Sequence, residues 1–197
     1  MMTDEAVTGV ILAGGLSRRM GGADKGLQLL GDKPLLQCVL ERFAPQVDEL
    51  LVNANQNQER YQAFGYPVLG DQFPGFAGPL AGLQVALARA AHPLVATVPC
   101  DSPFLPVDLV ARLRAALVLH GADLATARSF AQPQPAFCLC RRELLPQLTS
   151  FLERGGRKLD LWHRTLNTIE VAFDDDLAAF KNINTAEQLA NASGSER

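Results

Sequence analysis

The sequence lacks a long hydrophobic stretch, a surplus of positive charge and a basic leader, and each absence excludes a class of protein. Every apolar run is interrupted well before the ~20 residues that span a bilayer, so we expect no membrane association. The net charge of −3 is the opposite of what nonspecific nucleic-acid binding requires, so no nucleic-acid partner is predicted. The first residues, MMTDEAV, lack the basic n-region of a secretory signal, and we expect a cytoplasmic protein.

Patterns typical of metal or disulfide sites are also scarce. The four cysteines and three histidines include no Cys-x-x-Cys pair and no cluster with zinc spacing. Cys138 and Cys140 stand two positions apart, so on a strand they would share one face. We therefore predict buried free thiols rather than a structural zinc site or a disulfide framework.

What the sequence does contain is an alternation of short apolar runs with longer amphipathic segments. Runs such as PLVATV are apolar throughout, which is typical of parallel strands covered on both faces. This predicts a three-layer α/β fold with a mostly parallel central sheet, in one domain over residues 1–197 with 192–197 frayed. Strands are expected at 7–13, 49–55, 67–71, 93–98, 122–129, 135–140 and 167–173, and helices at 33–46, 56–65, 80–91, 106–121, 143–156 and after Thr185.

The loop after the first predicted strand carries the densest signal. In GGLSRRMGGADKG, glycines such as Gly14 and Gly15 would let backbone amides approach an anion closely. Arg18, Arg19 and Lys25 add three positive charges within the same loop, and such cations bind phosphate. The stretch matches neither the P-loop nor the dinucleotide fingerprint. We predict a polyphosphate site, with a solvated surface loop as the alternative.

Carboxylates and amides follow the other predicted strands. Asp101 ends the strand 93–98, where a buried carboxylate is costly unless it is paired, caps a turn or binds a metal. Mg²⁺ takes one or two protein carboxylates together with phosphate oxygens, so Asp101 is a candidate ligand, and a turn cap is the alternative. Asp71 ends another strand and suits either a metal or a base or ribose. Asn53 and Asn55 suit sugars, bases or phosphates, and ordinary turn chemistry is their alternative.

Several stretches in fixed order resemble one family. LAGGLSRRMGGADK, NAN, GPLAG, PCDSP and NINTAE together resemble the molybdenum cofactor guanylyltransferases, which are nucleotidyltransferases of the sugar-nucleotide type. The resemblance extends from about residue 8 to residue 190. It implies a Rossmann-like fold, an N-terminal nucleotide-binding part and a C-terminal acceptor-binding part. It also implies transfer of GMP from Mg-GTP to molybdopterin, with release of pyrophosphate.

The resemblance also implies roles for individual residues. Arg19 and Lys25 would hold the triphosphate, Asp101 would hold Mg²⁺, and these three are the expected catalytic residues. Asn182 and Asn184 would face the pterin. The expected nucleotide-binding residues are Leu12, Ala13, Gly14, Gly15, Lys25, Asn53, Asp71, Gly78, Pro79, Leu80, Gly82 and Asp101.

Two sequence details refine this assignment. Relatives that use CTP tend to read A-A-G where this chain has Ala13, Gly14 and Gly15, and a glycine at position 14 leaves more space for a purine. Guanine is therefore favoured. Some sugar-nucleotide relatives hold the metal with a second, late aspartate, whereas this chain has KNINT. We therefore expect weak Mg²⁺ binding in the absence of nucleotide.

A basic stretch, ERGGRKLDLWHR (153–164), offers an anchor for the acceptor. Its glycine pair predicts a flexible loop, and we expect Arg157 and Lys158 to bind the phosphate or dithiolene end of molybdopterin. The alternative is a solvated helix end whose cations face the preceding carbonyls. The alternatives for the whole chain are a CTP-dependent molybdopterin cytidylyltransferase, a sugar-1-phosphate nucleotidylyltransferase and a noncatalytic GTP-sensing module. A transient protein partner that delivers molybdopterin is also expected.

Overall fold

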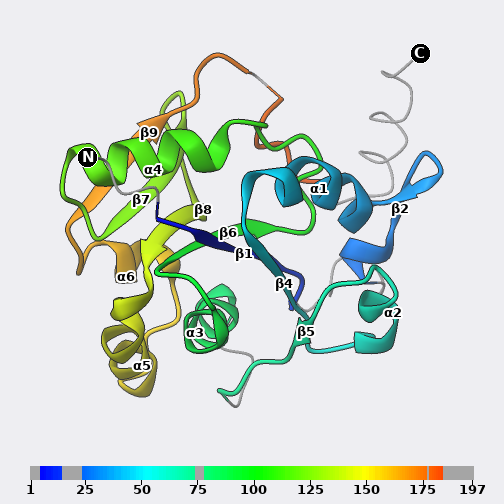
Figure 1. Cartoon of the computed structure of the whole chain (residues 1–197), viewed down its shortest axis with the longest axis horizontal. Helices are drawn as coiled ribbons and strands as arrows, with labels where there is room; N and C mark the ends of the chain where they lie inside the picture. The colour runs from blue at the N-terminus through cyan, green and yellow to red at the C-terminus, as the bar shows by residue number, and fades with distance from the viewer. Residues whose placement is uncertain (1–4, 15–23, 74–77, 177, 184–197) are drawn as a thin grey trace.

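One seven-stranded sheet organises the molecule (Figure 1). The computed structural model describes residues 5–14, 24–73, 78–176 and 178–183. The strands lie in the order β5-β4-β1-β6-β8-β7-β9, and all neighbours are parallel except β8, which is antiparallel to β6 and to β7. Their bounds are β1 Val7–Leu12, β4 Glu49–Asn53, β5 Val68–Leu69, β6 Leu94–Pro99, β7 Leu124–Ser129, β8 Gln132–Arg141 and β9 Thr168–Ala172.

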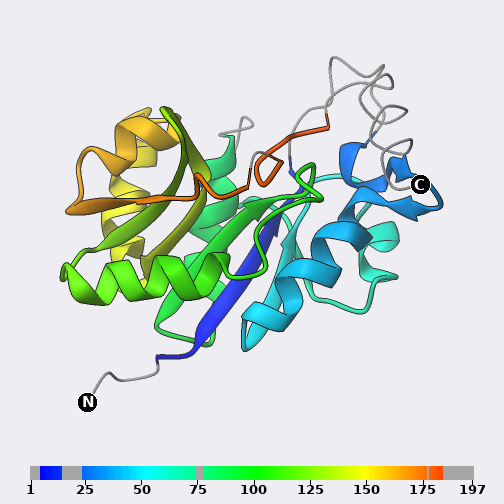
Figure 2. The same ribbon diagram turned by 90° about the horizontal axis from the view of Figure 1, so that it is seen from above.

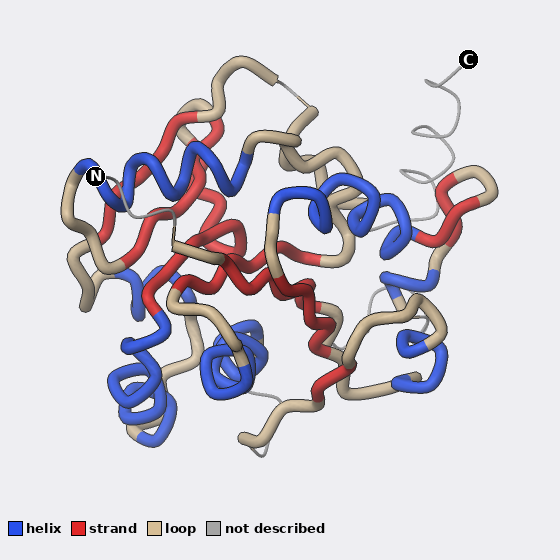
Figure 3. Tube along the Cα trace, viewed as in Figure 1, coloured by secondary structure: helices blue, strands red, loops and turns tan. Residues whose placement is uncertain are grey.

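Helices cover both faces of this sheet, which confirms the three-layer α/β prediction (Figures 1 and 3). Helices α1 (Leu35–Phe43) and α4 (Leu109–Leu119) pack on one face, where α2 (Gln58–Gln62) contributes Tyr61. Helices α3 (Pro79–Arg89), α5 (Leu145–Glu153) and α6 (Leu159–His163) pack on the other. Side chains of successive strand residues point to opposite faces, so Ile11 of β1 joins the first core and Val10 the second. That is why these strands read as continuously apolar.

Some predicted elements differ in extent or kind. The expected helix 33–46 is preceded by a small hairpin of β2 (Leu29–Leu30) and β3 (Lys33–Pro34), because Pro34 adopts an extended conformation. Short 3-10 helices are present at Lys25–Leu27 (η2), Ala44–Gln46 (η3) and Arg142–Leu144 (η4). The expected helix after Thr185 and the frayed segment 192–197 lie outside the described residues.

The prediction of a flexible loop over 153–164 is wrong for its second half. Helix α6 forms there because Leu159 and Trp162, three positions apart, bury one face in the core beside α3 and α5. The charged residues of this half, such as Asp160 and Arg164, occupy the exposed side of the helix.

The carboxyl ends of β1, β4 and β6 lie side by side at one edge of the sheet. Leu12 pairs in register with Asn53 on one side and with Pro99 on the other. The sheet order reverses here, since β4 and β5 extend to one side of β1 and the later strands to the other. Such a switch point is where open α/β sheets bind ligands. After β9 the chain returns to the same edge (Figure 2), and the Ile183 amide donates to the Asp101 carbonyl at 2.8 Å.

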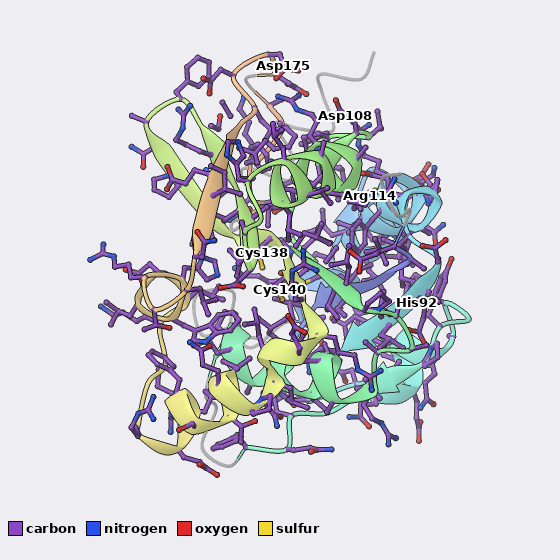
Figure 4. The ribbon with its side chains drawn as sticks, turned by 60° about the vertical axis from the view of Figure 1, so that its left-hand side comes forward. His92, Asp108, Arg114, Cys138, Cys140 and Asp175 are labelled. Atoms are coloured by element: carbon purple, nitrogen blue, oxygen red, sulfur yellow. The ribbon has the colours of Figure 1, made fainter. Side chains whose placement is uncertain are left out.

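The cysteines are free thiols, and three of them are buried. Cys138 and Cys140 lie on β8 in the core shared with α3 and α5 (Figure 4), which confirms that they share a strand face. Burial raises the pKa of Cys138 to about 11, so this thiol is inert as a nucleophile. Over the described ranges, no helix is both long enough and apolar enough to cross a bilayer.

Candidate active site

A pocket opens at the carboxyl edge of β1, β4 and β6. Most of its wall comes from residues that the sequence already suggested, including Lys25 and Asp101. Pro99, Cys100 and Ala136 complete it. The predicted residues in the wall are Leu12, Ala13, Gly14, Lys25, Asn53, Gly78, Pro79 and Asp101. The structure therefore brings together the loops after three strands, as the position of their polar residues predicted.

Lys25 and Asp101 form an ion pair across this pocket. Nζ of Lys25 lies 3.1 Å from Oδ2 of Asp101, and the side chains are 29% and 12% exposed. The Asp101 carboxylate is thus compensated by the basic loop, which meets the requirement that a nearly buried charge be paired. The pair joins the loop after β1 to the loop after β6. A triphosphate entering here would meet a cation and a carboxylate side by side.

The two asparagines of the NAN stretch hold Asp71. Nδ2 of Asn53 donates to Oδ1 of Asp71, and Nδ2 of Asn55 donates to Oδ2, both at 2.8 Å. Oδ1 of Asn55 accepts the Asp71 amide at 2.8 Å, and its Nδ2 lies 3.3 Å from the Gly14 carbonyl. Each carboxylate oxygen therefore has its own amide donor. The Asp71 carboxylate is fixed beside the pocket wall that Asn53 lines, with a defined direction for its remaining lone pairs.

Glycines make room for this amide pair. A Cβ on Gly82 would lie 2.4 Å from Oδ1 of Asn53, and one on Gly14 would lie 2.9 Å from Nδ2 of Asn55. The close amides are therefore a second reason for glycine at position 14, beside the predicted space for a purine. Gly78 opens α3 with φ +71°, a conformation that side chains disfavour.

The C-terminal return reaches the same edge. Oγ of Ser102, the residue after Asp101, donates to Oδ1 of Asn182 at 2.5 Å. This bond holds Asn182 near Asp101, although the Asn182 side chain is exposed. The basic segment also comes close, since its Arg157 carbonyl is 3.8 Å from where a Cβ on Gly78 would stand. Nη1 of Arg157 donates to the carbonyls of Leu152 and Gly156, the contact expected of a cation at a helix end.

The sequence matches a known family of enzymes. Residues 9–166 match the family described as the MobA-like NTP transferase domain. The chain belongs to this family. It is a nucleotidyltransferase, and the resemblance seen in the ordered motifs is confirmed.

Full-length relatives share about half of this transferase's sequence. Proteins named molybdenum cofactor guanylyltransferase from Cupriavidus necator and Shewanella sp. are 48% and 47% identical over 194 and 182 residues. The first alignment covers 96% of this chain and 97% of the relative, and the second covers 92% of each.

Solved structures confirm the Rossmann-like transferase fold. Molybdopterin-guanine dinucleotide biosynthesis protein A from Archaeoglobus fulgidus superposes with a TM-score of 0.79 at 22% identity, covering 96% of this chain and 100% of that one. A 4-diphosphocytidyl-2C-methyl-D-erythritol synthase from Anaerococcus prevotii gives 0.78 at 11%, covering 98% and 99%. At such identities the likeness concerns the fold alone.

Two predicted nucleotide-binding residues of the transferase lie behind the pocket wall. Leu80 is fully buried in the core and Gly82 lies beneath Asn53, so both support the pocket wall from behind. Gly15, Arg19 and Asn184 lie outside the described residues.

Sequence reasoning also missed parts of the transferase pocket. Ala136 reaches it because the pairing of β7 with β8 shifts register beside it, while Oγ1 of Thr97 donates to its carbonyl at 2.8 Å. No local pattern predicts that. Cys100 stands inside the PCD stretch and could have been found there. Burial raises its pKa far above the usual range, so the thiol is a neutral part of the wall.

Proposed function

We propose that this transferase moves GMP from Mg-GTP to molybdopterin, giving the guanine dinucleotide cofactor and pyrophosphate. The observation that carries the proposal is the convergence of Lys25, Asp101 and the Asn53–Asp71 pair on one pocket in a chain 48% identical to a molybdenum cofactor guanylyltransferase. The lining of this cavity thus contains a cation for phosphate, Lys25, and a polar group for a base, Asn53, which Asp71 supports from behind.

The residues present suit Mg²⁺ that arrives with the nucleotide. Across residues 5–14, 24–73, 78–176 and 178–183, no three His, Cys, Asp or Glu side chains gather into a cage for a metal. Mg²⁺ does not need one, because one or two carboxylates suffice when phosphate oxygens and water complete its octahedron. Asp101 would supply that carboxylate. When bound, the ion would neutralise charge on the triphosphate and its leaving group.

The reaction needs little proton transfer from the protein. A phosphate monoester has a second pKa near 6, so the molybdopterin phosphate is largely a dianion at pH 7. Its oxygen would attack the α-phosphorus of GTP as the bond to the β-phosphate bridging oxygen breaks, releasing pyrophosphate. The chain's task is then to align two anions and to stabilise the charge that develops on the leaving group. Lys25 serves the second purpose, together with Arg19.

Asp101 positions the ammonium group of Lys25 through their ion pair. The 3.1 Å ion pair keeps the ammonium group at the end of β6 before the nucleotide enters. With nucleotide bound, Lys25 would exchange its carboxylate partner for phosphate oxygens, and the Asp101 carboxylate would be available to hold Mg²⁺. The exchange keeps each charge compensated within the pocket.

The acceptor side is built from the C-terminal half. Asn182, which Ser102 holds at 2.5 Å, would face the pterin together with Asn184. Lys158 is exposed, and its neighbour Arg157 has its carbonyl beside Gly78 of the pocket. We assign Lys158 to the acceptor's phosphate or dithiolene end. Arg157 would serve partly through its contacts with the end of α5.

Calorimetry with GTP, CTP and ATP in the presence of Mg²⁺ tests the proposal. Wild type should bind GTP in preference to the others, and Asp101→Ala should bind it without metal dependence. Preference for CTP would favour the cytidylyl alternative. Binding with no GMP transfer to molybdopterin would favour a GTP sensor. The single domain, the cytoplasmic location and a molybdopterin-delivering partner stay predictions.

A further inference from the structure

Asp24, the residue before Lys25, is anchored to helix α2. The phenol of Tyr61 donates a short hydrogen bond to Oδ1 of Asp24, and Nδ2 of Asn57 donates to Oδ2 at 3.1 Å. Tyr61 is fully buried and belongs to the first core. Both oxygens of the carboxylate are therefore held from one side, by α2 and its N-cap, 33 to 37 positions away.

The hydrogen bonds to α2 take the place of the capping hydrogen bond that an aspartate normally makes at the start of a helix. Asp24 is the N-cap of the 3-10 helix η2, and its side chain makes no capping hydrogen bond. Aspartate usually stabilises a helix start by accepting a backbone N–H, so here the carboxylate forgoes that bond to reach α2. The backbone around it is still fixed, since the Asp24 carbonyl accepts from the Leu27 amide at 3.2 Å.

Gly26, on the other side of Lys25, fits the same phenol. A Cβ at this position would lie 2.6 Å from the Tyr61 hydroxyl oxygen, so the close approach requires glycine. The three consecutive residues therefore have two different roles. The outer two fit around Tyr61, and the middle one directs its ammonium group to Asp101.

We propose that Tyr61 is a positioning residue of the transfer reaction, which acts through Asp24 to hold Lys25 at the triphosphate. The inference rests on the proposed function, since it needs Lys25 to contact the β- and γ-phosphates. Tyr61 does not itself line the pocket. A lysine side chain has several rotatable bonds, so fixing its backbone at two neighbouring residues limits where the ammonium group can lie.

A hydroxyl suits this role better than a charged donor. Burial, reinforced by the neighbouring carboxylate, raises the pKa of Tyr61 far above its usual value, so the phenol stays protonated and donates at every working pH. Its bond to a carboxylate is charge-assisted and therefore stronger than a neutral one. The positive charges of the loop remain available to the nucleotide.

Tyr61→Phe tests the inference, with Tyr66→Phe as its matched control. The chain has only these two tyrosines, and Tyr66 packs partly buried against the same core. Affinities for GTP and for GMP are measured by calorimetry. Tyr61→Phe should weaken GTP about tenfold, the usual range for a lost hydrogen bond to a charged group. It should leave GMP unchanged, because GMP lacks the phosphates that Lys25 holds. Tyr66→Phe should change neither.

A double-variant cycle with Lys25→Ala separates positioning from general destabilisation. If Tyr61 acts through Lys25, adding Tyr61→Phe to Lys25→Ala should weaken GTP no further. Equal losses for GTP and GMP, or losses that multiply in the double variant, would overturn the inference. Asp24→Leu, which removes both acceptor oxygens at similar size, should reproduce the GTP-specific loss even if Tyr61→Phe folds poorly. Failure of wild type to bind GTP would instead overturn the proposed function.

Discussion

Lys25 and Asp101, 76 positions apart in the sequence, meet with Nζ 3.1 Å from Oδ2. The pair connects the loop after the first strand with the loop after β6. It also explains how a carboxylate can stand at 12% side-chain exposure at the end of a buried strand.

Replacing Asp101 by alanine should slow GMP transfer by about 10²–10³-fold, the usual cost of one electrostatic contact to the developing charge. The variant removes both the expected metal ligand and the partner of Lys25. The rate at saturating GTP and Mg²⁺ is the measurement. Asp32→Ala, in the exposed turn between β2 and β3, is the control and should transfer GMP at the wild-type rate. A wild-type rate for Asp101→Ala would refute the role given to this carboxylate.

Gly82→Ala should weaken GTP binding at least tenfold. It should also lower the free energy of unfolding, although the higher helix propensity of alanine, worth ~1 kcal/mol, offsets part of that loss. The new Cβ would approach Oδ1 of Asn53 to 2.4 Å and Cδ2 of Leu12 to 2.9 Å, so both pocket residues must shift. Calorimetry of GTP binding and thermal unfolding check the two effects separately. Arg89→Ala, at the exposed end of the same helix, should leave GTP affinity unchanged. Unaltered affinity in Gly82→Ala would contradict the fit described for Asn53.

Asn55→Ala should lower discrimination between GTP and CTP. It removes one of the two amides on the Asp71 carboxylate and the acceptor of the Asp71 amide. Stability should fall by about 1–3 kcal/mol, because the partly buried carboxylate and amide of Asp71 lose their partners. Competition binding with the two nucleotides measures the selectivity, and Gln56→Ala, the exposed neighbour, serves as the reference. A loss of stability with unchanged selectivity would mean that Asn55 supports the fold only.

The free energy of unfolding should fall as the pH is lowered from about 6.5 towards 4, and His163 should account for part of this. Burial without a partner for Nε2 lowers the pKa of His163 to about 4, against 6.5 for an unperturbed histidine. In that window the unfolded chain binds a proton and the native chain does not, so protonation favours unfolding. At about 1.4 kcal/mol per pKa unit, the difference between about 4 and 6.5 gives an effect of at most roughly 3.5 kcal/mol.

Urea unfolding of His163→Gln at pH 7 and at pH 5 measures this contribution. The variant should lose less stability between the two pH values than wild type does. His120→Gln alters an exposed histidine and should follow wild type. Parallel pH dependence of wild type and His163→Gln would show that His163 is not responsible.

Charge reversal in the basic segment should affect the acceptor rather than the nucleotide. Lys158→Glu should raise the KM for molybdopterin about tenfold and leave GTP binding unchanged. Arg157→Glu should do the same and in addition lower stability, because its guanidinium donates to the Leu152 carbonyl at the end of α5. Steady-state kinetics against each substrate provide the test, with Arg164→Glu at the far end of α6 as comparison. Equal loss toward both substrates would rule out an acceptor site here.

The class of fold and the predicted chemistry of the loops follow from local features of the sequence. Alternating apolar runs and amphipathic segments suffice to predict covered parallel strands, and arginine, lysine and aspartate beside glycines suffice to predict a site for phosphates. These signals are local, since each depends on neighbours within one or two turns of chain. The hairpin β2–β3 and helix α6 were missed because their patterns are short.

Which side chains meet, in contrast, depends on the tertiary packing. Leu12 faces both Asn53 and Pro99 through strand register, Ala136 enters the pocket through a shift in the pairing of β8, and Tyr61 reaches Asp24 from a separate helix. A hydrogen bond requires its atoms to lie within about 3 Å. Such a distance between residues dozens of positions apart depends on how whole strands and helices pack, which no local pattern in the sequence records.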